Sequence, residues 1–111
     1  MAQDRLATLL QFYEEDPNDG FTRFALASEY LKRGDTAQAL SFFEALVADD
    51  PAYVGTYYHL GKLYETLGRA EEALTTYRNG IQMAQRQRDF HARAELQSAL
   101  LEAQGLGGDE F

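Results

Sequence analysis

The sequence predicts an all-α protein of about six helices, which pair as antiparallel hairpins and stack on one another. Apolar residues recur at intervals of three and four along most of the 111-residue chain, as amphipathic helices require. The chain has only two prolines, and no segment alternates between polar and apolar residues in the manner of a strand. A pattern of apolar, aromatic and glycine positions also occurs twice, 34 residues apart.

The repeat is visible when residues 25–43, ALASEYLKRGDTAQALSFF, are aligned without a gap with residues 59–77, HLGKLYETLGRAEEALTTY. Five positions are identical: Leu26/Leu60, Tyr30/Tyr64, Gly34/Gly68, Ala39/Ala73 and Leu40/Leu74. A fixed period of this length, built from two helices, is typical of a stacked helical array. Each hairpin alone leaves an apolar face open, so neighbouring hairpins must cover one another.

The helix boundaries follow from stop signals in the sequence. Pro17 ends the first helix, the segment DDP at 49–51 ends the third, and Gly34 and Gly68 permit the tight turns inside the hairpins. We expect helices at about 2–14, 21–33, 36–48, 54–67, 70–86 and 89–104. They form one domain, 1–104, with a half repeat at 2–14, repeats at 20–51 and 54–86, a capping helix at 89–104 and a flexible tail at 105–111.

The repeated positions resemble the tetratricopeptide repeat family, whose pattern is W-x2-L-G-x2-Y, then A-x3-F, then P. The second unit matches at Tyr57, Leu60, Gly61, Tyr64, Ala73 and Tyr77, and the first at Leu26, Ala27, Tyr30, Ala39, Phe43 and Pro51. Arg23 stands where the first unit should have a large aromatic residue, and Gln85 replaces the closing proline of the second. The resemblance implies a right-handed α-solenoid that acts as a protein-binding module.

Composition narrows the choice of function. The net charge of −8 opposes binding to nucleic acid or to anionic membranes. No apolar run reaches the length of a membrane span, the start of the chain does not read as a signal peptide, and the absence of cysteine suits a cytoplasmic location. From Met1 and the final tail we expect a complete small protein.

Catalytic chemistry finds little support in the sequence. Neither His59 nor His91 has a second histidine at i+4, an H-E-x-x-H arrangement or a cysteine partner, so we expect no metal and no cofactor. Glu71 and Glu72 are adjacent on a helix and point about 100° apart, which disfavours an acid–base pair on one face. We therefore expect a protein that is not an enzyme, and an enzyme of unknown type is a distant third hypothesis.

The first hypothesis is a scaffold that binds a partner peptide or helix. In proteins similar to this one, the first helix of each hairpin lines a concave groove. Transferred by position, the groove candidates are Phe21, Phe24, Ser28, Leu31, Lys32, Tyr58, His59, Lys62, Glu65 and Arg93. The family's clamp for chaperone carboxylates uses lysine and asparagine at places that here hold Phe24, Ser28 and His59, so a co-chaperone role is disfavoured.

Two alternatives remain open. The first helix of the chain could cover Phe21 and Phe24, which would remove them from the groove. The protein could also form a homodimer through its terminal helices, with Phe12 and Phe42 as the candidate contacts because both fall outside the main apolar stripes.

Overall fold

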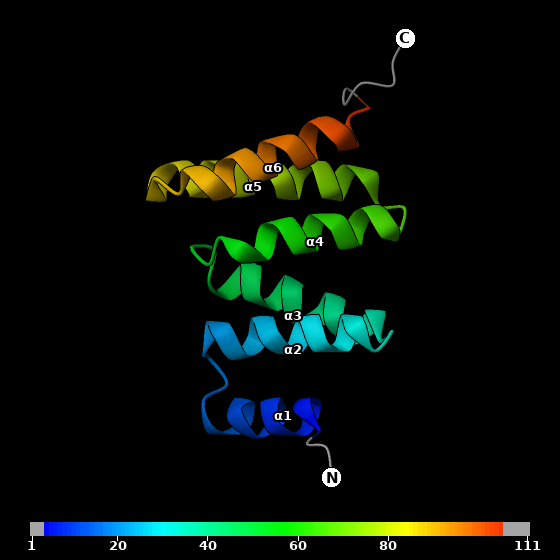
Figure 1. The fold of residues 1–111 in the computed structure, drawn as a ribbon, viewed down its shortest axis with the longest axis vertical. Helices are drawn as coiled ribbons and strands as arrows, with labels where there is room; N and C mark the ends of the chain where they lie inside the picture. Colours follow the sequence, from blue (N-terminus) through cyan, green and yellow to red (C-terminus); the bar gives the residue numbers. More distant parts are fainter. Residues whose placement is uncertain (1–3, 106–111) are drawn as a thin grey trace. The chain divides into compact units, whose positions relative to one another are not determined.

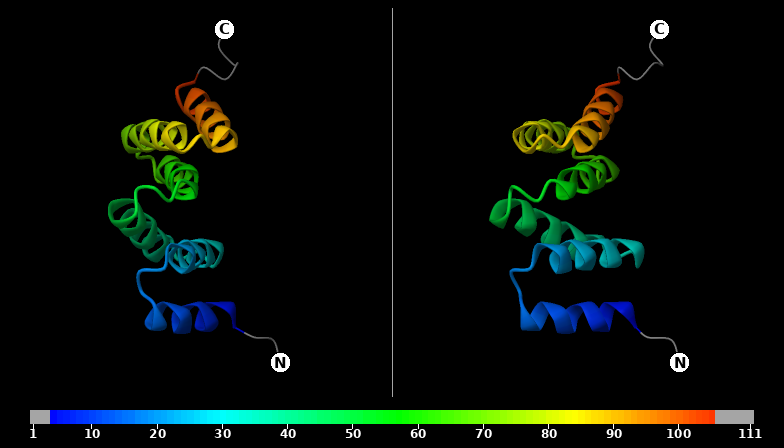
Figure 2. Two further views of the ribbon diagram at one scale, coloured as in Figure 1. Left: turned by 90° about the vertical axis from the view of Figure 1, so that its left-hand side faces the viewer. Right: turned by 60° about the vertical axis from the view of Figure 1, so that its left-hand side comes forward.

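The computed structural model describes residues 4–105, and all of its regular structure is helical over that range. The helices are α1 (Arg5–Glu15), α2 (Gly20–Lys32), α3 (Thr36–Asp49), α4 (Gly55–Thr66), α5 (Ala70–Gln87) and α6 (Phe90–Ala103). Figure 1 and Figure 2 show them joined by short connections in chain order. The all-α helical repeat class is confirmed.

The helix boundaries agree closely with the repeat pattern. From α2 to α6, each end lies within one residue of the position that the sequence predicts. The first helix begins at Arg5, whereas residues 2 and 3 of its expected range lie outside the described residues. The expected flexible tail also lies outside them, apart from Gly105.

Aspartate side chains cap most of the helix N-termini. The carboxylates of Asp4, Asp19, Asp35 and Asp89 each accept a hydrogen bond from a backbone N–H in the first turn of α1, α2, α3 and α6 respectively. Such caps satisfy donors that the helix itself leaves without partners. At α5 the equivalent residue is Arg69, which makes no side-chain cap.

Glycines with positive φ close two of the hairpin turns. Gly34 has φ 85° and Gly68 has φ 75°, so both adopt the left-handed conformation expected from the sequence. The third turn uses Arg88, with φ 58°, after an α5 that continues to Gln87. A side chain in this conformation is strained where glycine would not be.

We expect Arg88→Gly to raise the free energy of unfolding by roughly 0.5–1 kcal/mol, because glycine removes the left-handed strain. Chemical denaturation followed by circular dichroism measures the change. The control is Arg86→Gly, inside the last turn of α5, which is expected to lower stability by about 1 kcal/mol. Equal destabilisation by both exchanges would contradict the assignment of strain to Arg88.

The chain divides into two compact units, Met1–Tyr53 and Val54–Phe111. In the first unit, Leu9 of α1 packs with Ala25 and Leu26 of α2. The ring of Phe42 lies between those of Tyr13 and Tyr30, at centroid distances of 5.4 and 5.8 Å. Apolar and aromatic packing therefore joins α1, α2 and α3 into one core.

Two charged residues are buried in the same unit. Arg23 is 7% exposed, and its guanidinium lies 2.8 Å from the Asp49 carboxylate on α3. Glu29 is also 7% exposed and pairs with Arg33 at 2.9 Å and with Arg5 at 3.4 Å. One repeat later the equivalent positions hold Tyr57 and Leu63, which are also buried. At these two positions unit 1 therefore has buried ion pairs, whereas unit 2 has apolar side chains.

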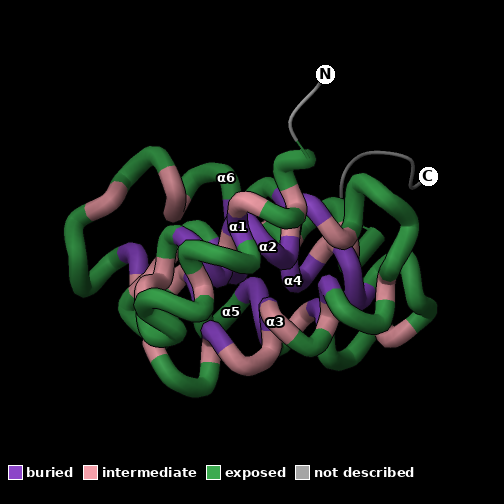
Figure 3. The backbone as a smooth tube through the Cα atoms, turned by 90° about the horizontal axis from the view of Figure 1, so that it is seen from below, coloured by how far each residue is buried: buried purple, intermediate pink, exposed green. Residues whose placement is uncertain are grey.

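In the second unit, glycines allow close helix contacts. A Cβ atom on Gly61 of α4 would overlap the ring of Tyr77 on α5. A Cβ on Gly80 would lie 2.6 Å from Tyr57 Cβ and 3.0 Å from Leu96 Cδ1 of α6. Figure 3 shows buried and exposed stretches alternating along the helices, so each helix keeps one face for packing and leaves another to solvent.

Candidate functional site

The expected groove residues of the second unit lie on α4 and α6, and several of those on α4 contact one another. Tyr58, His59 and Lys62 lie on α4 and Arg93 on α6. The rings of Tyr58 and His59 meet edge to face at 5.6 Å, and the Lys62 ammonium lies 5.6 Å from the centre of the Tyr58 ring. These contacts hold an aromatic ring and a cation together at the surface.

Two further residues of α6 make contacts, one within the helix and one to α4. The Arg93 guanidinium lies 5.5 Å from the centre of the Phe90 ring, and Phe90 is 62% exposed. Lys62 Nζ lies 3.7 Å from Glu102 Oε1, which links α4 to α6. The four residues Tyr58, His59, Lys62 and Glu102 are called the α4–α6 face below, and Phe90 and Arg93 form a separate pair at the start of α6.

Phe90 and Glu102 were not predicted from the sequence. The extra turn of α5 shifts α6 out of the 34-residue register, so positions on α6 cannot be transferred from α4 by counting. The available signal for Phe90 was an aromatic residue directly after Asp89, at the start of a helix with many polar residues.

His59 has an environment that disfavours its charge. Burial lowers the pKa of its imidazole, and the nearby Glu95 carboxylate partly opposes this effect by raising the pKa. Burial removes water from the charged form, whereas an anion stabilises it. The positive charge of the α4–α6 face at neutral pH therefore comes from Lys62.

Glu65 was also expected in the groove, but its side chain contacts α5. Its carboxylate accepts a hydrogen bond from the Tyr77 hydroxyl on α5. Burial raises the pKa of Tyr77, and the Glu65 carboxylate raises it further. Glu65 thus contributes to the α4–α5 contact, while Lys62 and Glu102 connect α4 to α6.

The candidates in the first unit all lie on α2, but they differ in exposure. Phe21 is 64% exposed, Leu31 is 37% exposed and Lys32 is exposed, whereas Ser28 is half-buried. Phe24 is also half-buried, and its ring centroid lies 5.9 Å from those of both Phe43 and Tyr53. Phe21 is therefore accessible to a ligand, whereas Phe24 belongs in large part to the packing between α2 and α3.

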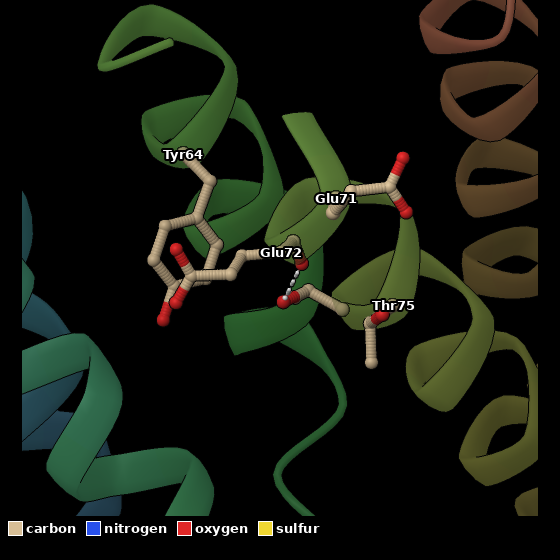
Figure 4. Close-up of a pocket in the computed structure, with 5 residues that line it drawn as sticks. Tyr64, Glu71, Glu72 and Thr75 are labelled. Carbon is tan, nitrogen blue, oxygen red and sulfur yellow. Dashed lines mark hydrogen bonds between the residues drawn. The ribbon is translucent and has the colours of Figure 1, made fainter. Parts of the chain in front are cut away.

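A hollow of about 300 Å³ lies beside the start of α5. Figure 4 shows its lining residues, which are Tyr64, Glu71, Glu72, Thr75 and Thr76. In the figure the two carboxylates point apart, and Arg69 holds that of Glu72 through two hydrogen bonds of 2.5 and 2.8 Å. Thr76 Oγ1 donates to the Glu72 carbonyl at 2.7 Å. This hollow presents no pair of carboxylates placed for acid–base chemistry.

The two aromatic residues expected at a dimer contact have different environments. Phe42 is half-buried between Tyr13 and Tyr30, so packing within its own chain uses most of its surface. Phe12 is 48% exposed. Only Phe12 of this pair presents a large free surface.

Metal clusters and membrane-spanning helices are two further kinds of feature that the described residues could form. Over residues 4–105 no three histidine, aspartate or glutamate side chains gather as metal ligands would. Within the same range, no helix combines the length and apolar character needed to cross a membrane.

The fold defines a helical repeat protein. The family model of the tetratricopeptide repeat matches residues 30–100, more than half of the chain, and the chain belongs to this family. Proteins of the family are in general non-catalytic modules for protein interaction.

Solved structures agree with this assignment. The crystal structure of a tetratricopeptide repeat domain protein from Salinibacter ruber is 53% identical, with a TM-score of 0.76 over 79% of this chain and 98% of that one. A protein from Bordetella parapertussis, 24% identical, shares the fold with a TM-score of 0.77 over 92% of this chain and 89% of its own. A search of curated proteins gave no significant match.

Proposed function

We propose that this protein is a scaffold that binds a partner peptide or helix, and that in its second unit the first helices of the hairpins provide the binding surface. The observation that carries the proposal is the α4–α6 face. Its side chains are exposed or half-buried, and the glycine and aromatic positions that pack α4 on α5 lie elsewhere on the helix. Residues that packing does not require are available for recognition.

The chemistry of the face favours a peptide that has both apolar and acidic side chains. On this face Tyr58 supplies aromatic surface and Lys62 supplies positive charge, and Phe90 and Arg93 supply the same two kinds of group at the start of α6, in a chain of net charge −8. Aromatic residues and arginine are the residue types that most often dominate binding energy.

We expect Lys62→Glu to weaken peptide binding at least tenfold, because it replaces an attraction for acidic residues with a repulsion, an effect of about 1.4 kcal/mol or more. Peptides are first selected against the full chain from a displayed random library, and the recovered peptide is then titrated by calorimetry. Phe21→Ala tests separately whether α2 of the first unit takes part in binding, because this exposed ring can be removed without opening the core.

The matched control is Arg78→Glu, which makes the same change of charge at an exposed position on α5. It should leave affinity within about twofold, a difference well below 1 kcal/mol. Circular dichroism confirms that each variant is folded. Folded Lys62→Glu and Phe21→Ala proteins that bind as tightly as the parent would overturn the assignment of the groove.

A further inference from the structure

The Lys62 ammonium of the α4–α6 face already has a carboxylate beside it. Its Nζ atom lies 3.7 Å from Glu102 Oε1 on α6 and 5.6 Å from the centre of the Tyr58 ring on α4. Tyr58 and Lys62 stand at i and i+4, so both side chains lie on one side of α4. The cation is therefore held between an aromatic ring of its own helix and an anion of another helix.

This ion pair is open to solvent. The Lys62 side chain is 40% exposed and the Glu102 side chain is 63% exposed. The Arg23–Asp49 pair differs, because there the arginine side chain is only 8% exposed. Ion pairs between exposed side chains contribute little to folding stability and are weakened by salt. A carboxylate of a ligand can therefore reach Lys62 and replace that of Glu102.

Buried apolar side chains hold α6 in its place in the second unit. Leu96 and Ala99 of α6 are 1% and 2% exposed, and Leu96 reaches the close contact at Gly80 of α5. Burial of apolar surface stabilises a helix contact more than an exposed ion pair does. Removing the charge of Glu102 should therefore leave α6 packed against α4 and α5.

A second carboxylate of α6 acts on α4 in a similar manner. Glu95 stands seven residues before Glu102, which places the two on the same side of α6. The Glu95 carboxylate raises the pKa of His59, against the larger and opposite effect of burial. Glu95 and Glu102 thus give α6 an acidic edge that acts on His59 and Lys62 of α4. An acidic peptide bound to α4 would present carboxylates to the same two side chains.

We propose that Glu102 is an internal competitor for the peptide site, because its carboxylate occupies the place beside Lys62 that an acidic side chain of the peptide takes on binding. This role rests on the proposed function, in which an acidic peptide contacts Lys62. The peptide displaces the Glu102 side chain into solvent, which its exposure permits. The protein therefore selects peptides whose carboxylate is better placed at Lys62 than that of Glu102.

Glu102→Gln removes the competing charge and keeps the shape of the side chain. We expect this variant to bind the peptide recovered from the displayed library about two- to fivefold more tightly in calorimetry, which is the range that exposed ion pairs contribute. In a Lys62→Gln background the same exchange should give no gain, because Glu102 acts through Lys62. The matched control is Glu71→Gln, which makes the same change of charge at an exposed position on α5 and should leave affinity within about 1.5-fold.

A measurement without peptide tests the contact itself. The chain has two lysines, Lys32 and Lys62, so their acylation by an amine-reactive reagent is followed separately by mass spectrometry. In Glu102→Gln we expect Lys62 to react roughly twofold faster, because the carboxylate no longer holds its amine, and Lys32 to react at the parent rate. Equal labelling of Lys62 in the two proteins would overturn the proposal.

The outcomes in calorimetry separate the role of Glu102 from the proposed function. If Lys62→Gln weakens binding but Glu102→Gln does not strengthen it, α4 remains the peptide site and Glu102 is not a competitor. If Glu102→Gln weakens binding, Glu102 contacts the peptide directly, which also overturns the proposal. If no peptide depends on Lys62, the proposed site itself fails, and the competitor role fails with it.

Discussion

Replacing Phe43 with alanine is expected to lower the free energy of unfolding by about 4 kcal/mol, the usual cost of removing a buried phenylalanine ring from a core. Phe43 is fully buried in α3, and its ring meets that of Phe24 on α2 at 64° and 5.9 Å. Its removal leaves a cavity between the two helices of the first hairpin. Urea unfolding followed by circular dichroism measures the loss.

The matched control is Phe21→Ala, which removes the same ring from a position that is 64% exposed. This exchange should change stability by no more than about 0.5 kcal/mol. A Phe43→Ala protein as stable as the Phe21→Ala protein would show that the first hairpin does not depend on the Phe24–Phe43 contact.

We expect the second largest effect from Gly61→Ala, which should lower stability by about 2 kcal/mol despite the better helix propensity of alanine. The added methyl group would overlap the ring of Tyr77. That ring cannot withdraw freely, because its hydroxyl donates a hydrogen bond to Glu65 and its side chain is buried. Denaturant titration, together with hydrogen exchange of the α4 and α5 amides, locates the loss in the second hairpin.

Gly55→Ala is the control for this second exchange, because Gly55 is an exposed residue at the start of the same helix. There the methyl group should leave stability unchanged or raise it by a few tenths of a kcal/mol. If Gly61→Ala also left stability unchanged, close approach of α4 and α5 would not be the reason for glycine at this position.

The fold could be predicted from the sequence because the repeat fixes both helix ends and packing positions. Gly34 and Gly68 have the conformation that their places in the pattern require, and Gly61 makes the close contact expected of a small residue. Burial was less predictable at the edges of the apolar faces. Leu10, on the expected apolar stripe of α1, is 36% exposed, because a short terminal helix has fewer neighbours to cover it.

The candidate site was harder to predict than the fold. Side chains that reach across helices, such as Lys62 to Glu102 and Glu65 to Tyr77, depend on rotation and offset between helices, which periodicity does not specify. The sequence marked Arg23 as a departure from the pattern, but it did not identify Asp49 as its partner, 26 residues further along the chain. Long-range polar pairs of this kind become visible only in three dimensions.

The Arg23–Asp49 pair also affects which helices of the chain pair with one another during folding. Two similar hairpins in one chain could in principle exchange their second helices. If α5 took the place of α3 against α2, the position equivalent to Asp49 would be Met83, and the guanidinium would be buried beside a thioether. A buried charge without its counterion is strongly unfavourable. The Arg23–Asp49 ion pair thus makes the native hairpin of α2 and α3 more stable than a mispaired hairpin of α2 and α5.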